Sequence, residues 1–192
     1  MANNNVEVEI KTRVMKSDFV RVEKYIKNKF EFVKSSHQVD TYYSPAKKLF
    51  LKPKYPYEWL SIRKRDDKIV LNYKHWYPEG HKVTTHCDEY ESKFENSEQL
   101  EIILKVLNFE KLVTVEKTRN VYKNGDFEIA LDNVKGLGYF IEIESINNIG
   151  GVKRAHKNIL NFAKLLNIDT SVFVPGGYAA EMMRRKGLMK LR

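Results

Sequence analysis

The chain has 192 residues, 42% of them hydrophobic, which is enough to bury one substantial core, so a single domain over 1–192 is expected. Its net charge of +9 favours a polyanionic partner, and charge alone does not choose among a nucleotide, polyphosphate, nucleic acid and an acidic membrane surface. The lone Cys87 excludes an internal disulfide and a cysteine metal cluster, and no apolar run is long enough to predict a membrane span. We therefore expect a cytoplasmic protein without a membrane partner.

The first predicted element in chain order is a strand from Val6 to Val14. Residues 7–11 read Glu-Val-Glu-Ile-Lys, so a strand directs their charged side chains to one face and their aliphatic ones to the other. From Ser17, the predicted N-cap, the apolar residues recur at helical spacing. An extended segment follows from Val33 to Tyr43, and the three prolines within 45–56 predict a loop after it.

The middle of the chain predicts a hairpin, a third strand and a helix. The expected strands are Trp59–Arg65, Ile69–His75 and one that ends near Phe94, with turns at 66–68 and 78–80. After Ser97, the apolar residues from Leu100 to Leu107 recur at helical spacing, and early glutamates suit the helix dipole. This helix is expected to cover one face of the sheet.

The last third of the chain predicts another hairpin, a strand and two helices. Asn124-Gly125 is the strongest short-range hairpin signal in the sequence. The predicted strands are Leu112–Tyr122, Phe127–Asn133 and Tyr139–Ile146, and the predicted helices surround Ile159–Leu166 and Tyr178–Arg185. The whole chain thus has roughly eight strands and three or four helices.

The alternation of charge seen in the first strand returns in most later ones. The same-face pairs are Arg63/Arg65, Asn72/Lys74, Glu89/Glu91, Lys117/Arg119 and Glu142/Glu144. For any one of these strands, a solvated sheet face is the alternative interpretation. Because unpaired buried charges are very costly, a dry sandwich cannot enclose them all, whereas a closed or nearly closed barrel with a wet lumen can. We therefore predict an α+β fold with an antiparallel barrel and flanking helices.

Two kinds of chemistry are expected in such an interior. Carboxylates two residues apart on a strand lie roughly 6 to 7 Å apart, a spacing at which their oxygens can share hard cations. Arginine and lysine side chains bind phosphate oxygens as bidentate forks or as point charges. A site that combines both is what a complex of metal and triphosphate requires.

These residues resemble the CYTH superfamily, also called triphosphate tunnel metalloenzymes. It includes class IV adenylyl cyclases and thiamine, inorganic and RNA triphosphatases. The Glu-x-Glu-x-Lys signature of the family is matched by Glu7, Glu9 and Lys11. The later matches, in chain order, are Leu60-Ser61-Ile62-Arg63, Lys74, Glu89-Tyr90-Glu91, Lys117, Arg119, Asp132, Leu137-Gly138, Phe140, Glu142 and Glu144. The resemblance covers most of the chain, and both order and spacing fit.

The resemblance implies an eight-stranded antiparallel closed tunnel that holds Mg²⁺ or Mn²⁺ and a triphosphate. The candidate metal ligands are the carboxylates of Glu7, Glu9, Glu89, Glu91, Asp132, Glu142 and Glu144. The candidate substrate-binding residues are Lys11, Arg63, Lys74, Lys117 and Arg119, together with Arg65, which strand parity places beside Arg63. Lys11, Lys74 and Arg119 are also the candidate catalytic residues.

Two departures from the family pattern concern phosphate contacts, because Ser61 and Cys87 stand where many members have arginine. The reaction that we favour is that of a class IV adenylyl cyclase, which converts ATP to cyclic AMP and pyrophosphate. The alternatives are a triphosphatase acting on inorganic, thiamine, nucleoside or RNA 5′ triphosphate, and a module that binds nucleotide or polyphosphate without turnover. Nucleic acid is expected only as an RNA 5′ triphosphate, and a homodimer is left open.

Overall fold

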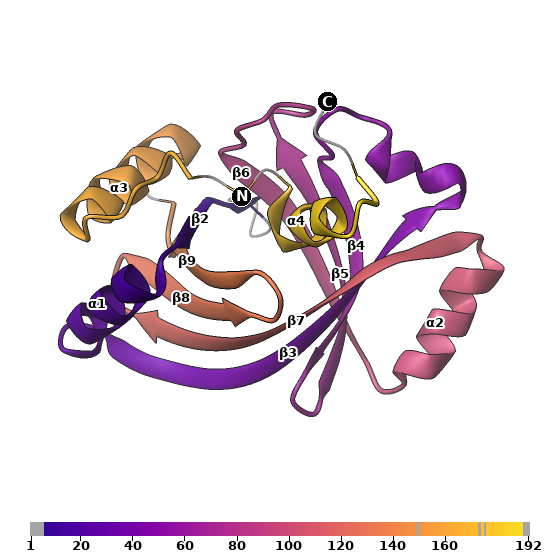
Figure 1. The fold of residues 1–192 in the computed structure, drawn as a ribbon, viewed down its shortest axis with the longest axis horizontal. Helices are drawn as coiled ribbons and strands as arrows, with labels where there is room; N and C mark the ends of the chain where they lie inside the picture. The colour runs from indigo at the N-terminus through magenta and orange to yellow at the C-terminus, as the bar shows by residue number, and fades with distance from the viewer. Residues whose placement is uncertain (1–5, 149, 173, 175, 190–192) are drawn as a thin grey trace. The chain divides into compact units, whose positions relative to one another are not determined.

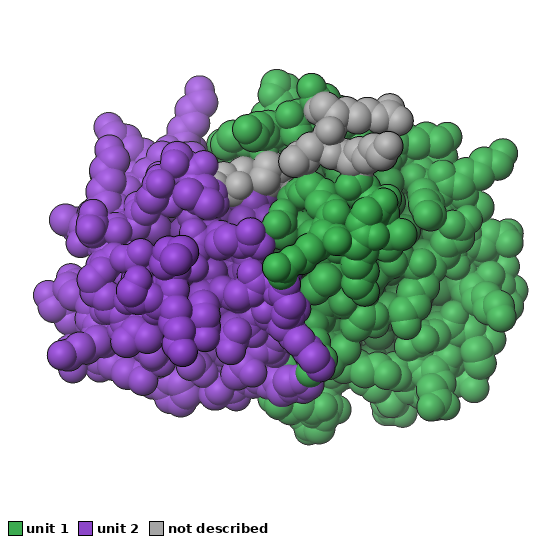
Figure 2. Space-filling view, viewed as in Figure 1, with its two compact units in different colours: residues 1–6, 38–116, 175–192 green, residues 7–37, 117–174 purple. Residues whose placement is uncertain are grey.

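The computed structural model describes residues 6–148, 150–172, 174 and 176–189, which divide into two compact units (Figure 2). Unit 1 comprises the described residues within 1–6, 38–116 and 175–192, and unit 2 those within 7–37 and 117–174. Two long strands, β3 (Glu31–Pro45) and β7 (Phe109–Lys123), contribute residues to both units. The division into two units does not test the predicted single domain over 1–192, which stays a prediction.

The strands of the described residues belong to one nine-stranded sheet. Besides β3 and β7 they are β1 (Val6–Glu7), β2 (Glu9–Val14), β4 (Glu58–Arg65), β5 (Lys68–Tyr77), β6 (His86–Phe94), β8 (Phe127–Val134) and β9 (Gly138–Ser145). The hydrogen-bonded order is β1-β6-β5-β4-β3-β7-β8-β9-β2. Val8 alone separates β1 from β2 along the chain, so the order nearly closes on itself, as in a nearly closed barrel.

The predicted α+β class and antiparallel sheet are confirmed. The pairs β2–β9, β8–β9, β7–β8, β3–β4, β4–β5 and β5–β6 are all antiparallel. The strand count is nine rather than eight because the predicted first strand is interrupted at Val8. The two pieces lie at the two ends of the strand order.

The helices of the described residues are α1 (Lys16–Lys27), α2 (Ser97–Val106), α3 (Val152–Leu165) and α4 (Gly177–Arg185), with a 3₁₀ helix at Ala46–Leu51 (Figure 1). None of them is long and apolar enough to cross a membrane. The Ser17 N-cap prediction was wrong, because Met15 precedes the first turn of α1 and makes no side-chain cap bond. In α2 the cap is Asn96, whose side-chain oxygen accepts from the backbone N–H groups of Glu98 and Gln99.

Within unit 2, one face of the sheet is apolar and is covered by α1 and α3, which contact β9 (Figure 1). Register places the buried side chains of Ile10, Ile143 and Ile129 in one row across β2, β9 and β8. The ring of Phe19 on α1 lies 4.9 Å from that of Tyr139 on β9, measured between centroids. Because side chains alternate along a strand, the charged residues of β2 and β7–β9 occupy the opposite face.

Within unit 1, α2 covers the apolar face of the sheet in the same way. Leu100 and Leu104 of α2 pack with Tyr43 of β3 and Ile62 of β4 in one buried cluster. Residues next to these in sequence, such as Arg63, therefore point to the opposite face. In each unit, helix packing on one face leaves the polar residues together on the other.

Truncating a core residue of α3 should destabilise the protein far more than truncating an exposed one. Ile159 is fully buried, whereas Leu165, at the end of the same helix, is 77% exposed. We expect Ile159→Ala to lower the free energy of unfolding by about 2–5 kcal/mol, since it leaves a cavity in the core. Leu165→Ala is the matched control and should change it by about 0.5 kcal/mol or less. Urea denaturation of both variants tests this, and similar losses would contradict the packing of α3.

Candidate functional site

Charged side chains gather on the polar face of the unit 2 sheet. Register sets Lys11 of β2 directly opposite Glu142 of β9, and Arg119 of β7 directly opposite Asp132 of β8. Glu9 precedes Lys11 by two residues and therefore shares its face. We call the set of Glu9, Lys11, Lys117, Arg119, Asp132 and Glu142 the unit 2 cluster.

Ion pairs join the unit 2 cluster into a chain of alternating sign. Lys11 Nζ lies 3.3 Å from Glu9 Oε1 and 2.9 Å from Glu142 Oε2. Arg119 donates to both oxygens of Glu142, at 3.2 and 2.9 Å, and as a fork to both oxygens of Asp132, at 2.7 and 2.6 Å. Lys117 Nζ completes the chain, 3.4 Å from Asp132 Oδ2. Every acid in it contacts at least one base.

Asp132 is the most enclosed member of this cluster, with no exposed surface. Burial alone raises the pKa of a carboxyl group, since it disfavours the charged form. Here the charges of Arg119 and Lys117, and the hydrogen bonds from Arg119, outweigh burial and hold the pKa of Asp132 below its usual value. Asp132 is therefore ionised at neutral pH and fixes the orientation of the Arg119 guanidinium.

A second charged group occupies the polar face of the unit 1 sheet. It consists of Arg63, Arg65, Asn72, Lys74, Glu89 and Glu91, which we call the unit 1 cluster. Arg63 Nη1 donates to Glu89 Oε1 at 3.0 Å and to Glu91 Oε1 at 2.9 Å. Lys74 Nζ lies 3.4 Å from Glu89, and the Asn72 amide donates to both glutamates. Arg65 Nη2 lies 3.8 Å from Glu91.

Arg63 is buried, with 9% of its surface exposed. Burial lowers the pKa of its guanidinium, but the charges of Asp40 and Glu89 oppose this and leave the pKa above its usual value. Asp40 lies directly opposite Arg63 in the register of β3 and β4 and is itself buried. Arg63 is thus a permanent cation surrounded by carboxylates.

The predicted site residues divide between the two clusters. The unit 2 cluster contains Glu9, Lys11, Lys117, Arg119, Asp132 and Glu142, and the unit 1 cluster contains Arg63, Arg65, Lys74, Glu89 and Glu91. Glu144 lies directly opposite Glu9 in register. Glu7 belongs to β1 and is therefore not part of the register between β2 and β9. The roles assigned to these residues stay predictions. So does the single tunnel that all of them were expected to line.

Two polar residues next to Arg63 were not among the predicted site residues. Asn72 was recognised only as part of a charged alternation, although it donates to Glu89 and Glu91 and is fully buried. Asp40 was not recognised at all, because its partner Arg63 is defined only by the register of β3 and β4. For Asn72 the signal was available, since it shares its strand face with Lys74.

The carboxylates of unit 2 have the donor chemistry that Mg²⁺ or Mn²⁺ requires. Glu9 and Glu144 are opposite each other, and Glu142 lies on the same face two residues from Glu144. Yet in the part of the chain that the structure describes, no three Asp, Glu, His or Cys side chains are grouped so that they could hold a metal ion. The ammonium of Lys11 lies between Glu9 and Glu142, so a cation there requires Lys11 to release at least one of them.

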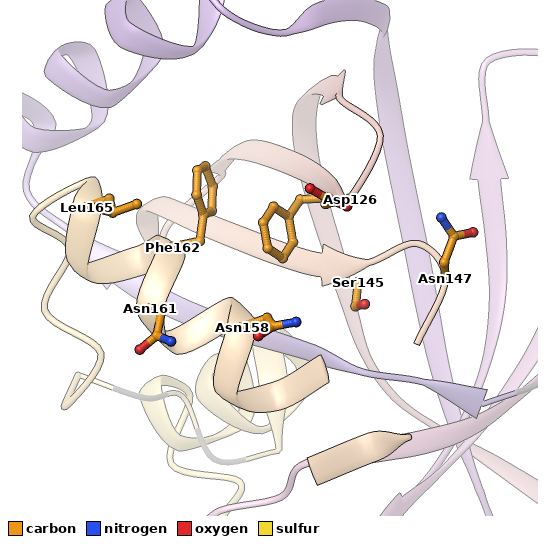
Figure 3. Close-up of a pocket in the computed structure, with 8 residues that line it drawn as sticks. Asp126, Ser145, Asn147, Asn158, Asn161, Phe162 and Leu165 are labelled. Carbon is orange, nitrogen blue, oxygen red and sulfur yellow. The ribbon is translucent and has the colours of Figure 1, made fainter. Parts of the chain in front are cut away.

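Unit 2 also contains a cavity of about 310 Å³ beside α3 (Figure 3). Asn158, Asn161 and Phe162 of α3 line one side of it, and the ends of β8 and β9 line the other. The rings of Phe127 and Phe162 stack with centroids 4.7 Å apart. None of the predicted site residues lines this cavity. The cavity is therefore distinct from the unit 2 cluster.

Comparison with known proteins gives one family and several relatives. The family model described as the CYTH domain matches residues 5–178. A Methanocaldococcus jannaschii protein named a "putative adenylate cyclase" is 32% identical over 174 residues, which cover 90% of this chain and 96% of that protein. The structure of a conserved hypothetical protein from Pyrococcus furiosus matches with a TM-score of 0.73 and 26% identity, covering 90% of this chain and 98% of its own.

A further solved structure is similar in fold. It is that of a Hippeastrum protein named a "putative adenylyl cyclase" and described as having a dominant triphosphatase activity. The TM-score is 0.65 at 16% identity, and the match covers 96% of this chain and 97% of that one. At this identity the likeness concerns the fold.

Removing the charge of Asp132 should destabilise unit 2. Asp132→Asn leaves Arg119 and Lys117 partly uncompensated, so we expect a loss of about 3–5 kcal/mol in the free energy of unfolding at neutral pH. Because the pKa of Asp132 is lowered by folding, its contribution is present above the usual carboxyl pKa, about 4, and is lost as pH falls through the lowered value. The difference from wild type should therefore shrink below about pH 4.

Urea denaturation between pH 3 and 7 measures this difference. Asp126→Asn is the matched control, since Asp126 is an exposed aspartate of the same unit. Its effect should be about 0.5 kcal/mol or less. Equal stability of Asp132→Asn and wild type at pH 7 would show that Asp132 does not hold the cluster together.

Proposed function

Because the chain belongs to the CYTH domain family, we propose that it is a metal-dependent enzyme that binds and processes a triphosphate. The resemblance found in the sequence is confirmed at the level of the family. The observation that carries the proposal is the chain of alternating acids and bases in unit 2, from Glu9 to Lys117, in which all three acids are buried. Such a set offers cations for phosphate oxygens and carboxylates for a metal ion on one sheet face.

In this proposal the basic residues of unit 2 bind the phosphate chain. Asp132 holds the guanidinium plane of Arg119 in place, and the edge of Arg119 that now pairs with Glu142 can form a bidentate contact with phosphate when Glu142 releases it. Lys11 and Lys117 act as point charges on either side of Arg119 along the chain of ion pairs. Their positive charge stabilises negative charge that develops on the leaving phosphate oxygens.

The charge balance of the clusters supports the need for a metal. In unit 1, two arginines and Lys74 face Glu89, Glu91 and Asp40, so bases and acids are equal in number. In unit 2, Lys11, Lys117 and Arg119 face three carboxylates in contact with them. A triphosphate therefore brings negative charge that the protein alone does not balance. A divalent ion would supply that balance, and Glu9, Glu142 and Glu144 would hold it once Lys11 releases Glu9 or Glu142.

The unit 1 cluster carries the same kind of chemistry. The side chains of Arg63 and Lys74 can bind phosphate oxygens, as can those of Lys11 and Arg119 in unit 2.

The reaction that we favour is the cyclisation of ATP to cyclic AMP and pyrophosphate. The ribose 3′-oxygen would attack the α-phosphorus, lose its proton, and displace pyrophosphate. The name of the M. jannaschii relative, at 32% identity over most of both chains, favours this reaction. The alternative is attack by water with release of phosphate, which the activity described for the Hippeastrum protein keeps in view. Both reactions place the same demand on Lys11, Lys117 and Arg119, which stabilise the departing phosphates.

A product assay decides between the reactions. We expect purified protein incubated with ATP and Mg²⁺ or Mn²⁺ to form cyclic AMP and pyrophosphate, resolved by chromatography. Glu142→Gln should lower kcat/KM by at least about 100-fold, because Glu142 contacts both Lys11 and Arg119. Glu23→Gln is the matched control, since Glu23 pairs with Lys27 on α1. ADP or free phosphate as product would support the triphosphatase, and retained binding without turnover would support a binding module.

Removal of divalent ions should abolish turnover and weaken binding of ATP. We expect this loss because acids and bases are equal in number in each cluster, so the protein alone does not compensate the negative charge of the triphosphate. Calorimetric titration of ATP with EDTA, compared with Mg²⁺ or Mn²⁺, measures the binding part directly. Equal ATP affinity under both conditions would contradict a metal-dependent site.

A further inference from the structure

One guanidinium nitrogen of unit 1 serves two carboxylates. Arg63 Nη1 is 3.0 Å from Glu89 Oε1 and 2.9 Å from Glu91 Oε1. Both carboxylates also accept from the amide of Asn72. The two like charges are therefore held close together by a shared cation and a shared amide. Either carboxylate occupies a direction in which Arg63 would otherwise donate to an incoming anion.

The two glutamates are not held equally. The Glu89 side chain is 12% exposed and also contacts Lys74 Nζ at 3.4 Å. The Glu91 side chain is 40% exposed, and its further basic contact, with Arg65 Nη2, is long at 3.8 Å. Water can replace the contacts of Glu91 at little cost, whereas Glu89 would lose contacts in a less hydrated place. Glu91 is thus the partner that can leave Arg63.

We propose that Glu91 is a displaceable counter-ion of Arg63 and Arg65, which gives way when a phosphate group binds these arginines. This inference rests on the proposed function and assigns Glu91 a role in selecting the ligand. It differs from the metal-ligand role that the sequence suggested for the same residue.

A displaceable carboxylate makes binding depend on the charge of the ligand. An anion must supply more favourable contact with the arginines than the one-charge carboxylate that it replaces. The groups of a polyphosphate do so through several oxygens and multiple negative charges, whereas orthophosphate offers little advantage. Glu91 therefore keeps singly phosphorylated or weakly charged ligands, which bind weakly, from occupying the arginines. Without it, Arg63 still pairs with Glu89, but the affinity for every phosphate ligand rises.

The test is the binding of inorganic tripolyphosphate and of orthophosphate in EDTA, measured by calorimetry. We expect Glu91→Gln to bind tripolyphosphate about 3- to 10-fold more tightly than wild type, the scale of a partly exposed charge contact. Orthophosphate should gain by a similar factor, because it displaces the same carboxylate. Glu95→Gln is the control, since it makes the same change of net charge at an exposed residue just beyond β6. It should leave both affinities within about twofold of wild type.

Four results would overturn the inference. Unchanged or weaker binding by Glu91→Gln in EDTA shows that the carboxylate does not compete with phosphate. An equal gain in Glu95→Gln shows that net charge alone is responsible. If Glu91→Gln weakens binding only when Mg²⁺ is present, Glu91 acts as a metal ligand instead. Failure of wild type to bind tripolyphosphate with or without Mg²⁺ or Mn²⁺ removes the proposed function itself, and the inference falls with it.

Discussion

The structure depends on one constraint, which is that charges buried on a sheet face must be compensated on that face. A period of two sends every second side chain of a strand to the same side, and antiparallel register decides which side chain stands opposite. In unit 2 that register sets Lys11 against Glu142 and Arg119 against Asp132. Pairing acid with base across strands makes a buried polar face tolerable, because an unpartnered buried charge costs several kcal/mol.

The two clusters meet this constraint differently, and the difference bears on function. In unit 2 the chain of ion pairs includes Asp132, which is fully buried and fixes Arg119 through two short contacts. In unit 1, Arg63 and Arg65 both contact Glu91, whose side chain is 40% exposed. The first arrangement preorganises a cation, and the second leaves a cation that can exchange its partner.

The sequence predicted the elements well because their signals are local. Alternation placed most strands, Asn124-Gly125 placed the hairpin of β7 and β8, and helical spacing placed α2 and α3. The break at Val8 was missed, because the alternation of charged and aliphatic residues continues through it. The N-cap of α1 at Met15 was also missed, because helical propensity does not fix the residue at which a helix begins. Which residues share a face followed from parity, but which residues touch did not. Asp40 shows why, since only the pairing of β3 with β4 brings it opposite Arg63.

The same pairing that makes the polar faces stable also limits what they can bind. Each base in the two clusters already has an acidic partner, so an anion gains only the difference between its own contacts and those that it replaces. That difference is small for one phosphate and grows with each further phosphate group and with each divalent ion that neutralises a released carboxylate. The preference that we propose for a metal-bound polyphosphate would therefore follow from the way the protein compensates its own charges, before any contact to a base or sugar is considered.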